Sequence, residues 1–217
     1  MALVLGVLIN YFGAAKGEPQ YIFLGVLLIT IAIILNGIAY KKALVGTKKL
    51  SAKGILLSIS AGIIMAFFYR FVAASMDLDN FASPAAGKLT PYTAVFVFAI
   101  GVFISNFLFN TIAMKKPVEG NPVSIKEYFK GKPATHLVGI LGGVIWCLGQ
   151  SFSMIASGKA GAAISYGLGQ GATLVSALWG ILIWKEFKNA PKISTYLNSG
   201  MFILFIIGLS LLIYAGA

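Results

Sequence analysis

Six stretches of this chain are almost continuously apolar over 20 residues or more. A helix of that length rises about 30 Å, which matches the hydrocarbon core of a lipid bilayer. The hydrophobic fraction of 59% and the mean hydropathy of +0.90 lie far above the values of a soluble globular domain. The sequence therefore predicts an all-α polytopic membrane protein, a helical bundle with spans at 21–40, 54–75, 92–114, 135–157, 160–184 and 193–214.

A seventh apolar run, residues 2–15, is shorter than the other six. As a helix it covers only about 21 Å of a hydrocarbon core that is about 30 Å thick. It resembles a helix whose beginning is missing. We therefore expect six to seven transmembrane helices.

The lysines are distributed unevenly among the connections between the spans. Thirteen of them lie within 41–53, 115–132 and 185–192, whereas the alternate connections hold only Lys16, Lys88 and Lys159. Lysine-rich loops face the cytoplasm. We therefore expect these three loops to be cytoplasmic and the C-terminus to lie outside.

The net charge of +11 then reflects membrane topology. No nucleic-acid partner is expected, because no basic segment is interleaved with aromatic residues on a solvated face.

Several chemistries are excluded by residues that the chain lacks. One cysteine, Cys147, and one histidine, His136, exclude an internal disulfide and a structural zinc site. The predicted spans contain no aspartate, glutamate or lysine, which removes a membrane carboxylate relay and a retinal Schiff base. We expect no catalytic residue, no metal site and no cofactor.

Two polar stripes stand out within the spans. Trp146, Gln150 and Ser153 recur at i, i+4 and i+7 and share one helix face. The next span repeats this spacing and follows after a very short connection, so the two stripes are expected to be the walls of one cavity. An amide beside an aromatic ring suits a polar, ring-shaped solute, although a hydrogen bond between helices is the alternative for each glutamine. The second stripe consists of Tyr166, Gln170 and Thr173.

Three further polar residues are weaker candidates for contact with a substrate. Asn106 and Asn110 lie one helical turn apart and are expected to point inward, toward a substrate or toward a partner helix. Arg70 is the only formal charge well inside a span, near its outer end. It is either a cavity gate or anion-binding group, or an arginine that extends to the lipid headgroups.

The glycine-rich segment Gly167-Leu-Gly-Gln-Gly171 has the wrong spacing and setting for a dinucleotide loop. We expect it to lie inside one continuous helix, where Gly167 and Gly171 form one small-residue packing face and Gly169 belongs to another. Gly139 and Gly143 make a similar pair in the preceding span.

A weak internal repeat appears when the chain is shifted by 172 residues. This shift places 3–19 over 175–191 and pairs Pro19 with Pro191. The lysine distribution assigns opposite sides of the membrane to the two copies. Inverted repeats of this kind are typical of secondary transporters.

Residues 141–191, which include WCLGQSFSMIASGKAGAAISYGLGQGATLVSALWG, closely resemble a known transporter family, as do 2–19 and 32–42 (AIILNGIAYKK). The resemblance is to bacterial relatives of the ureide permeases and of the glucose/ribose and L-rhamnose porters, in the drug/metabolite transporter superfamily.

This resemblance implies a fold of ten helices in two inverted repeats of five. Residues 1–41 would be the last two helices of the first repeat, 42–53 a basic cytoplasmic linker, and 54–217 the complete second repeat. About three N-terminal helices of the family pattern have no counterpart, and the linker lacks a G-x-x-x-x-G-K-[ST] motif, so ATP use is not expected.

The resemblance also implies a function. The chain would be a secondary transporter of a small polar solute, either a sugar or a ureide or nucleobase, acting by alternating access in the bacterial cytoplasmic membrane. A homodimer is possible. The alternative is a shortened paralogue that does not transport and serves as a structural or regulatory membrane module.

Overall fold

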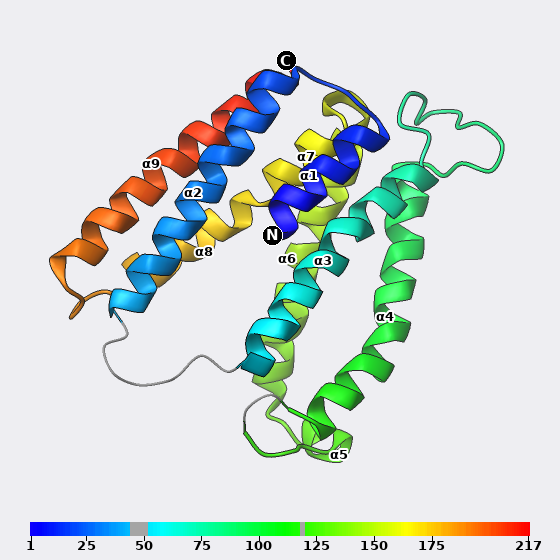
Figure 1. Cartoon of the computed structure of the whole chain (residues 1–217). Helices are drawn as coiled ribbons and strands as arrows, with labels where there is room; N and C mark the ends of the chain where they lie inside the picture. The colour runs from blue at the N-terminus through cyan, green and yellow to red at the C-terminus, as the bar shows by residue number, and fades with distance from the viewer. Residues whose placement is uncertain (44–51, 118–119) are drawn as a thin grey trace.

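The computed structural model describes residues 1–43, 52–117 and 120–217, and these residues form an all-α bundle (Figure 1). The predicted all-α polytopic fold is confirmed. Five of the described helices are long and apolar enough to cross a membrane. The helices are α1 (Ala2–Gly13), α2 (Pro19–Ala43), α3 (Ala52–Ser75), α4 (Pro91–Lys115), α5 (Ile125–Phe129), α6 (Pro133–Ala160), α7 (Ala162–Gly169), α8 (Gly171–Leu182) and α9 (Lys192–Ala215).

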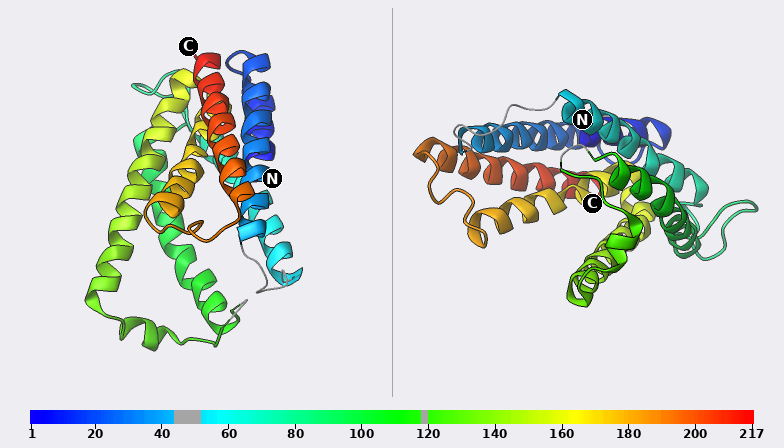
Figure 2. Two further views of the ribbon diagram at one scale, coloured as in Figure 1. Left: turned by 90° about the vertical axis from the view of Figure 1, so that its left-hand side faces the viewer. Right: turned by 90° about the horizontal axis from the view of Figure 1, so that it is seen from below.

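The helices form two groups that meet at α1 and α7. Helices α2 and α9 lie side by side, while α3, α4 and α6 form the other group (Figures 1 and 2). Helix α7 contacts α1, α6 and α9, and α1 contacts α3. These two short helices therefore join the bundle at its centre.

Helices α2 and α9 are antiparallel and cross closely at two glycines. Ser194 Oγ donates to the carbonyl of Ala39 at one end, and Glu18 N donates to the carbonyl of Ala215 at the other. A Cβ on Gly25 would lie 2.7 Å from the Gly208 carbonyl oxygen. Only a residue without a side chain allows the two backbones to approach this closely.

The predicted single span at 160–184 is wrong: the structure divides it into α7 and α8, with a turn at Gln170. Gln170 N donates to the Gly167 carbonyl, and Thr173 N donates to the Gln170 carbonyl, so the hydrogen bonds tighten to a three-residue spacing. Glycines around this point lower the helix propensity. In Figure 1 the chain changes direction here, so Tyr166 and Gln170 belong to different segments.

A second change of direction separates α6 from α7. Gly161 has a φ of +86°, in the left-handed region that glycine adopts without steric cost. The hairpin predicted from the short connection is therefore built around Gly161, and it brings α6 and α7 into contact.

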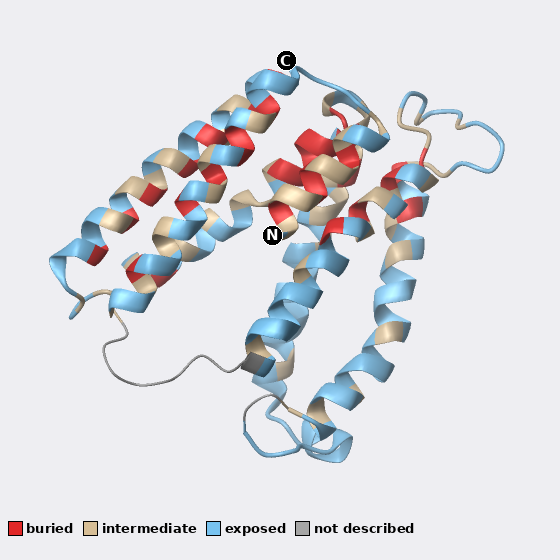
Figure 3. Cartoon of the chain, viewed as in Figure 1, coloured by how far each residue is buried: buried red, intermediate tan, exposed pale blue. Residues whose placement is uncertain are grey.

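Buried residues of α3, α4 and α6 gather at one end of the molecule (Figure 3). Tyr69 and Ala73 on α3, Ala94 on α4, and Met154 and Ser157 on α6 are all almost inaccessible. The opposite halves of these helices are exposed. The predicted linker 42–53 falls mainly on 44–51, outside the described residues.

Candidate functional site

A cavity of about 580 Å³ lies where the packed end of the bundle meets its exposed half. Its volume is in the range of pockets that hold small molecules. Helices α3, α6, α7 and α8 and the turn between the last two contribute side chains. Four of the predicted site residues line it together: Trp146, Gln150, Tyr166 and Gln170.

The α6 wall combines an aromatic ring with an amide. Trp146 and Gln150 are one turn apart on α6, and Ser153 continues the same face. The Nε2 atom of Gln150 is buried and has no hydrogen-bond partner among the described residues. An amide donor without a partner is costly in a buried site unless a ligand or water accepts from it. Gln150 is therefore available to bind a carbonyl or hydroxyl oxygen.

The α7 wall is held in place by hydrogen bonds. Tyr166 is buried, and its hydroxyl donates to the carbonyl of Ala2 at 3.1 Å and to that of Met65 at 3.4 Å. Its ring packs directly on Gly6, where a Cβ would lie 2.1 Å from a ring carbon. Gln170 occupies the turn between α7 and α8, and Thr173 Oγ1 donates to its carbonyl at 2.7 Å. The cavity thus lies at a break between two helices, as binding sites in transporters commonly do.

The α3 wall was not predicted. Met65, Phe68 and Tyr69 line the cavity at i, i+3 and i+4. The Tyr69 ring packs edge to face against the Tyr166 ring, with the centroids 5.6 Å apart. In the sequence Phe68 and Tyr69 belong to the aromatic run FFYRF, two residues after Met65, within an ordinary apolar span. Their spacing gives the only signal, since one helix face brings the three together.

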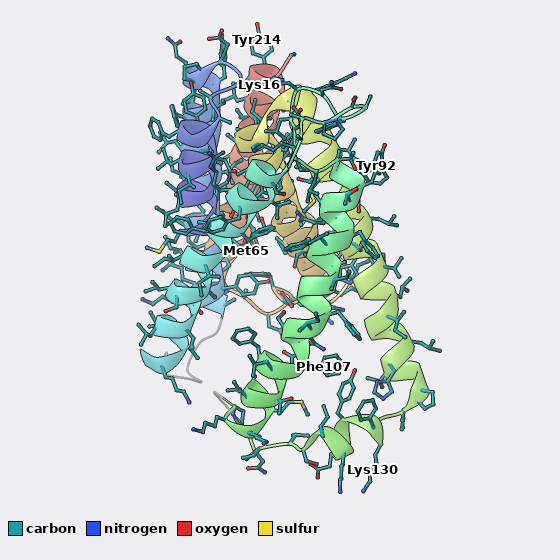
Figure 4. All side chains as sticks on the ribbon, turned by 90° about the vertical axis from the view of Figure 1, so that its right-hand side faces the viewer. Lys16, Met65, Tyr92, Phe107, Lys130 and Tyr214 are labelled. Carbon is teal, nitrogen blue, oxygen red and sulfur yellow. The ribbon has the colours of Figure 1, made fainter. Side chains whose placement is uncertain are left out.

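The structure does not bring Asn106, Asn110 or Arg70 to the cavity. Asn110 Nδ2 donates to Asn106 Oδ1, and both residues are exposed on α4, in the part of the helix that Phe107 marks in Figure 4. Arg70 lies against Gly13 at the end of α1, where a Cβ would be 2.2 Å from the guanidinium carbon. None of the three belongs to the cavity lining.

The predicted packing glycines fall into two groups. A Cβ on Gly167 would lie 2.9 Å from Leu212 Cδ1, and one on Gly171 would lie 3.5 Å from Leu209 Cδ1. These two glycines face α9. A Cβ on Gly139, Gly143 or Gly169 would meet no described atom within 4 Å, apart from its own helix backbone.

The fold and the cavity define a class: an integral membrane protein of several helices, with a polar and aromatic cavity of solute size inside the bundle. The family model described as ureide permease matches residues 30–215, and the chain belongs to this family. The resemblance stated from the sequence is confirmed.

Relatives of known sequence agree with this assignment. The chain is 29% identical to ureide permease 1 of Arabidopsis thaliana over 164 residues, which is 73% of this chain and 41% of the relative. It is 28% identical to ureide permease 4 over 164 residues, 73% of this chain and 40% of that relative. It is 27% identical to ureide permease 5 of the same plant over 186 residues, 83% of this chain and 44% of that relative. The chain therefore spans less than half the length of these relatives. No solved structure matches it.

Proposed function

We propose that this chain is a secondary transporter, or the substrate-binding part of one, for small uncharged polar solutes. The supporting observation is the cavity in which Trp146, Gln150, Tyr166 and Gln170 converge. Aromatic faces cover the apolar face of a ring, and the two amides bind its oxygen and N–H groups. The names of the relatives favour a ureide or a related nucleobase over a sugar.

Alternating access is the proposed mechanism, with residues 1–41 and 54–217 as parts of two inverted repeats joined by the linker 42–53. The arrangement of α2 and α9 supports it. The shift of 172 residues places α2 on α9, and equivalent helices of inverted copies run in opposite directions, as these two do. The same shift places α1 largely on α8.

Two glycines of α6 that make no contact with another described helix suggest how the protein assembles. Gly139 and Gly143 lie on the exposed half of α6 and touch no other described helix. Any helix that packs on them lies outside the described residues. We propose a second copy, which would make the transporter a homodimer.

Uptake measurements test the proposed function. The protein is reconstituted into liposomes, and uptake of labelled allantoin, uracil, glucose, ribose and rhamnose is followed. We expect uptake of allantoin or uracil. Loss of one hydrogen bond weakens binding by about 1 kcal/mol, so Gln150→Ala and Gln170→Ala should each lower uptake at low substrate concentration about fivefold.

Gln20→Ala is the matched control, because Gln20 is exposed at the start of α2 and is not part of the cavity lining. Uptake that is unchanged in Gln150→Ala and Gln170→Ala would remove the proposed site. Absence of uptake for every solute would instead favour the alternative, a membrane module that does not transport.

A further inference from the structure

Four side chains form a layer directly beside the cavity: Tyr69 on α3, Ser153 on α6, and Ser165 and Tyr166 on α7. We call them the tyrosine–serine layer. Three of them line the cavity, and Ser165 is the buried fourth. Tyr69 and Ser153 belong to the halves of α3 and α6 in which buried residues gather, and Ser165 and Tyr166 are themselves buried on α7. From this half α3 leads into the loop 76–90.

Hydrogen bonds join the helices across this layer. The Tyr69 hydroxyl donates to the Ser153 carbonyl at 2.9 Å and lies 3.1 Å from Ser153 Oγ. Ser153 Oγ in turn donates to the Ser165 carbonyl at 3.3 Å. Together with the Tyr166 bonds to Ala2 and Met65, these contacts tie α1, α3, α6 and α7 to one another.

The loop between α3 and α4 and the residue Lys16 both contact the end of α6. Phe81, in the loop between α3 and α4, packs on Gly158, where a Cβ would be 2.6 Å from its ring. Lys16 Nζ donates to the Gly158 carbonyl at 2.6 Å. The loop itself is ordered by Asp77, whose carboxylate accepts from the backbone N–H groups of Asn80 and Ala85. The Ala85 bond, the larger cause, and the Asn80 bond hold the pKa of Asp77 below its ordinary value.

The other side of the cavity has no comparable closure among the described residues. The α3 residues Ile55, Leu56, Ile59 and Met65 are exposed, as are most α6 residues from Leu137 to Leu148. Lys16 and Lys130 mark the two ends in Figure 4, and Met65 lies between them. The other three α3 residues precede Met65, in the half of α3 that lies toward the Lys130 end. The two sides of the cavity thus differ in how they are packed.

We infer that the tyrosine–serine layer is the gate that closes the cavity on the side of the loop 76–90, and that Tyr69 is its central residue. This inference rests on the proposed function, because a gate has a role only if the cavity takes up a solute. The layer is suited to reversible opening. Its links are neutral hydrogen bonds between helices, each of which contributes only modest net stability, so they can break without exposing a buried charge.

Cysteine labelling tests the gate without any substrate. Cys147 is the single native cysteine, so Cys147→Ser gives a cysteine-free background. Ala172→Cys then places a reporter on the cavity wall. Membrane vesicles of both orientations are treated with a membrane-impermeant thiol reagent, with Asp79→Cys and Lys130→Cys as markers for the two sides.

We expect the reporter to react from the Lys130 side and to be protected from the Asp79 side. Tyr69→Phe removes the hydroxyl that joins α3 to α6, and labelling from the Asp79 side should rise about fivefold. Tyr21→Phe is the matched control: it makes the same chemical change at the same end of the molecule, and Tyr21 packs against Tyr214 outside the layer. Ser153→Ala, which removes the link to Ser165, serves as the second variant if Tyr69→Phe does not fold.

With the layer unmodified, equal labelling of the cysteine at position 172 from both sides would overturn the inference. Unchanged protection of this cysteine in both Tyr69→Phe and Ser153→Ala would also overturn it, provided that both variants keep a normal size-exclusion profile. The labelling and the uptake measurements fail separately. Protection without any uptake would show that the layer closes this side of the cavity but would remove the proposed function, and with it the role of a gate. Uptake without protection would keep the proposed function and overturn the gate.

Discussion

At the scale of single residues, the position of Tyr166 depends on Gly6. A Cβ at position 6 would lie 2.1 Å from a Tyr166 ring carbon, so Gly6→Ala has to displace the ring and break its hydrogen bonds to Ala2 and Met65. We expect lower thermal stability in detergent, corresponding to about 1–3 kcal/mol for an overpacked contact, and weaker substrate binding. Gly37→Ala is the control, because a Cβ there meets nothing within 4 Å. Equal melting temperatures for the two variants would contradict this account.

The residues of the cavity were predictable in part. Trp146 and Gln150 were identified because polar groups inside an apolar span have few roles, and their spacing placed them on one face. Tyr69 was missed because a tyrosine among phenylalanines carries no such signal. Asn106 and Asn110 fit the same rule as the glutamines, yet their amides bond to each other on α4. Sequence spacing gives the face of a helix but not the neighbour of that face.

At the scale of helices, the crossing of α2 and α9 depends on Gly25 and Gly208. A Cβ on Gly208 would lie 2.8 Å from the Gly25 carbonyl oxygen, and a backbone atom cannot move aside as a side chain can. We expect Gly208→Ala to separate the helices and to lower the melting temperature in detergent by several degrees. Gly200→Ala on the same helix is the control, since its Cβ would be 3.5 Å from Leu35 Cδ1, an ordinary contact. A fall of equal size in both variants would refute the role of the crossing.

The helices themselves were largely predictable, because length and hydropathy determine a membrane span. The break at Gln170 was not. Hydropathy is the same for one straight helix and for two short ones, and the glycines of this segment were interpreted as packing faces. Gly167 and Gly171 do contact α9, but the same lack of side chains also permits the turn between them.

At the scale of the whole molecule, the lysines and the packing divide the protein in the same way. The described lysine-rich connections lie at the end where α3 and α6 are exposed, and the packed end carries the loop 76–90 with Asp77 and Asp79. Loops on the side of the membrane away from the cytoplasm are expected to carry few lysines and arginines. The repeat and the lysine count therefore predicted which ends of the helices lie together, although not how closely they pack.

The difference between the lysine-rich end and the packed end leads to a prediction for the orientation of the protein in the membrane. If the lysine-rich end is cytoplasmic, alkaline phosphatase fused after Ala217 in a bacterial host should be active, because the enzyme folds only outside the cytoplasm, while a fusion after Lys116 should be inactive. Green fluorescent protein at the same two positions is the reciprocal control and should fluoresce only after Lys116. The reverse pattern would place the lysine-rich end outside. The side of the cavity closed by the tyrosine–serine layer would then face the cytoplasm, and solute would enter the cavity of this conformation from outside.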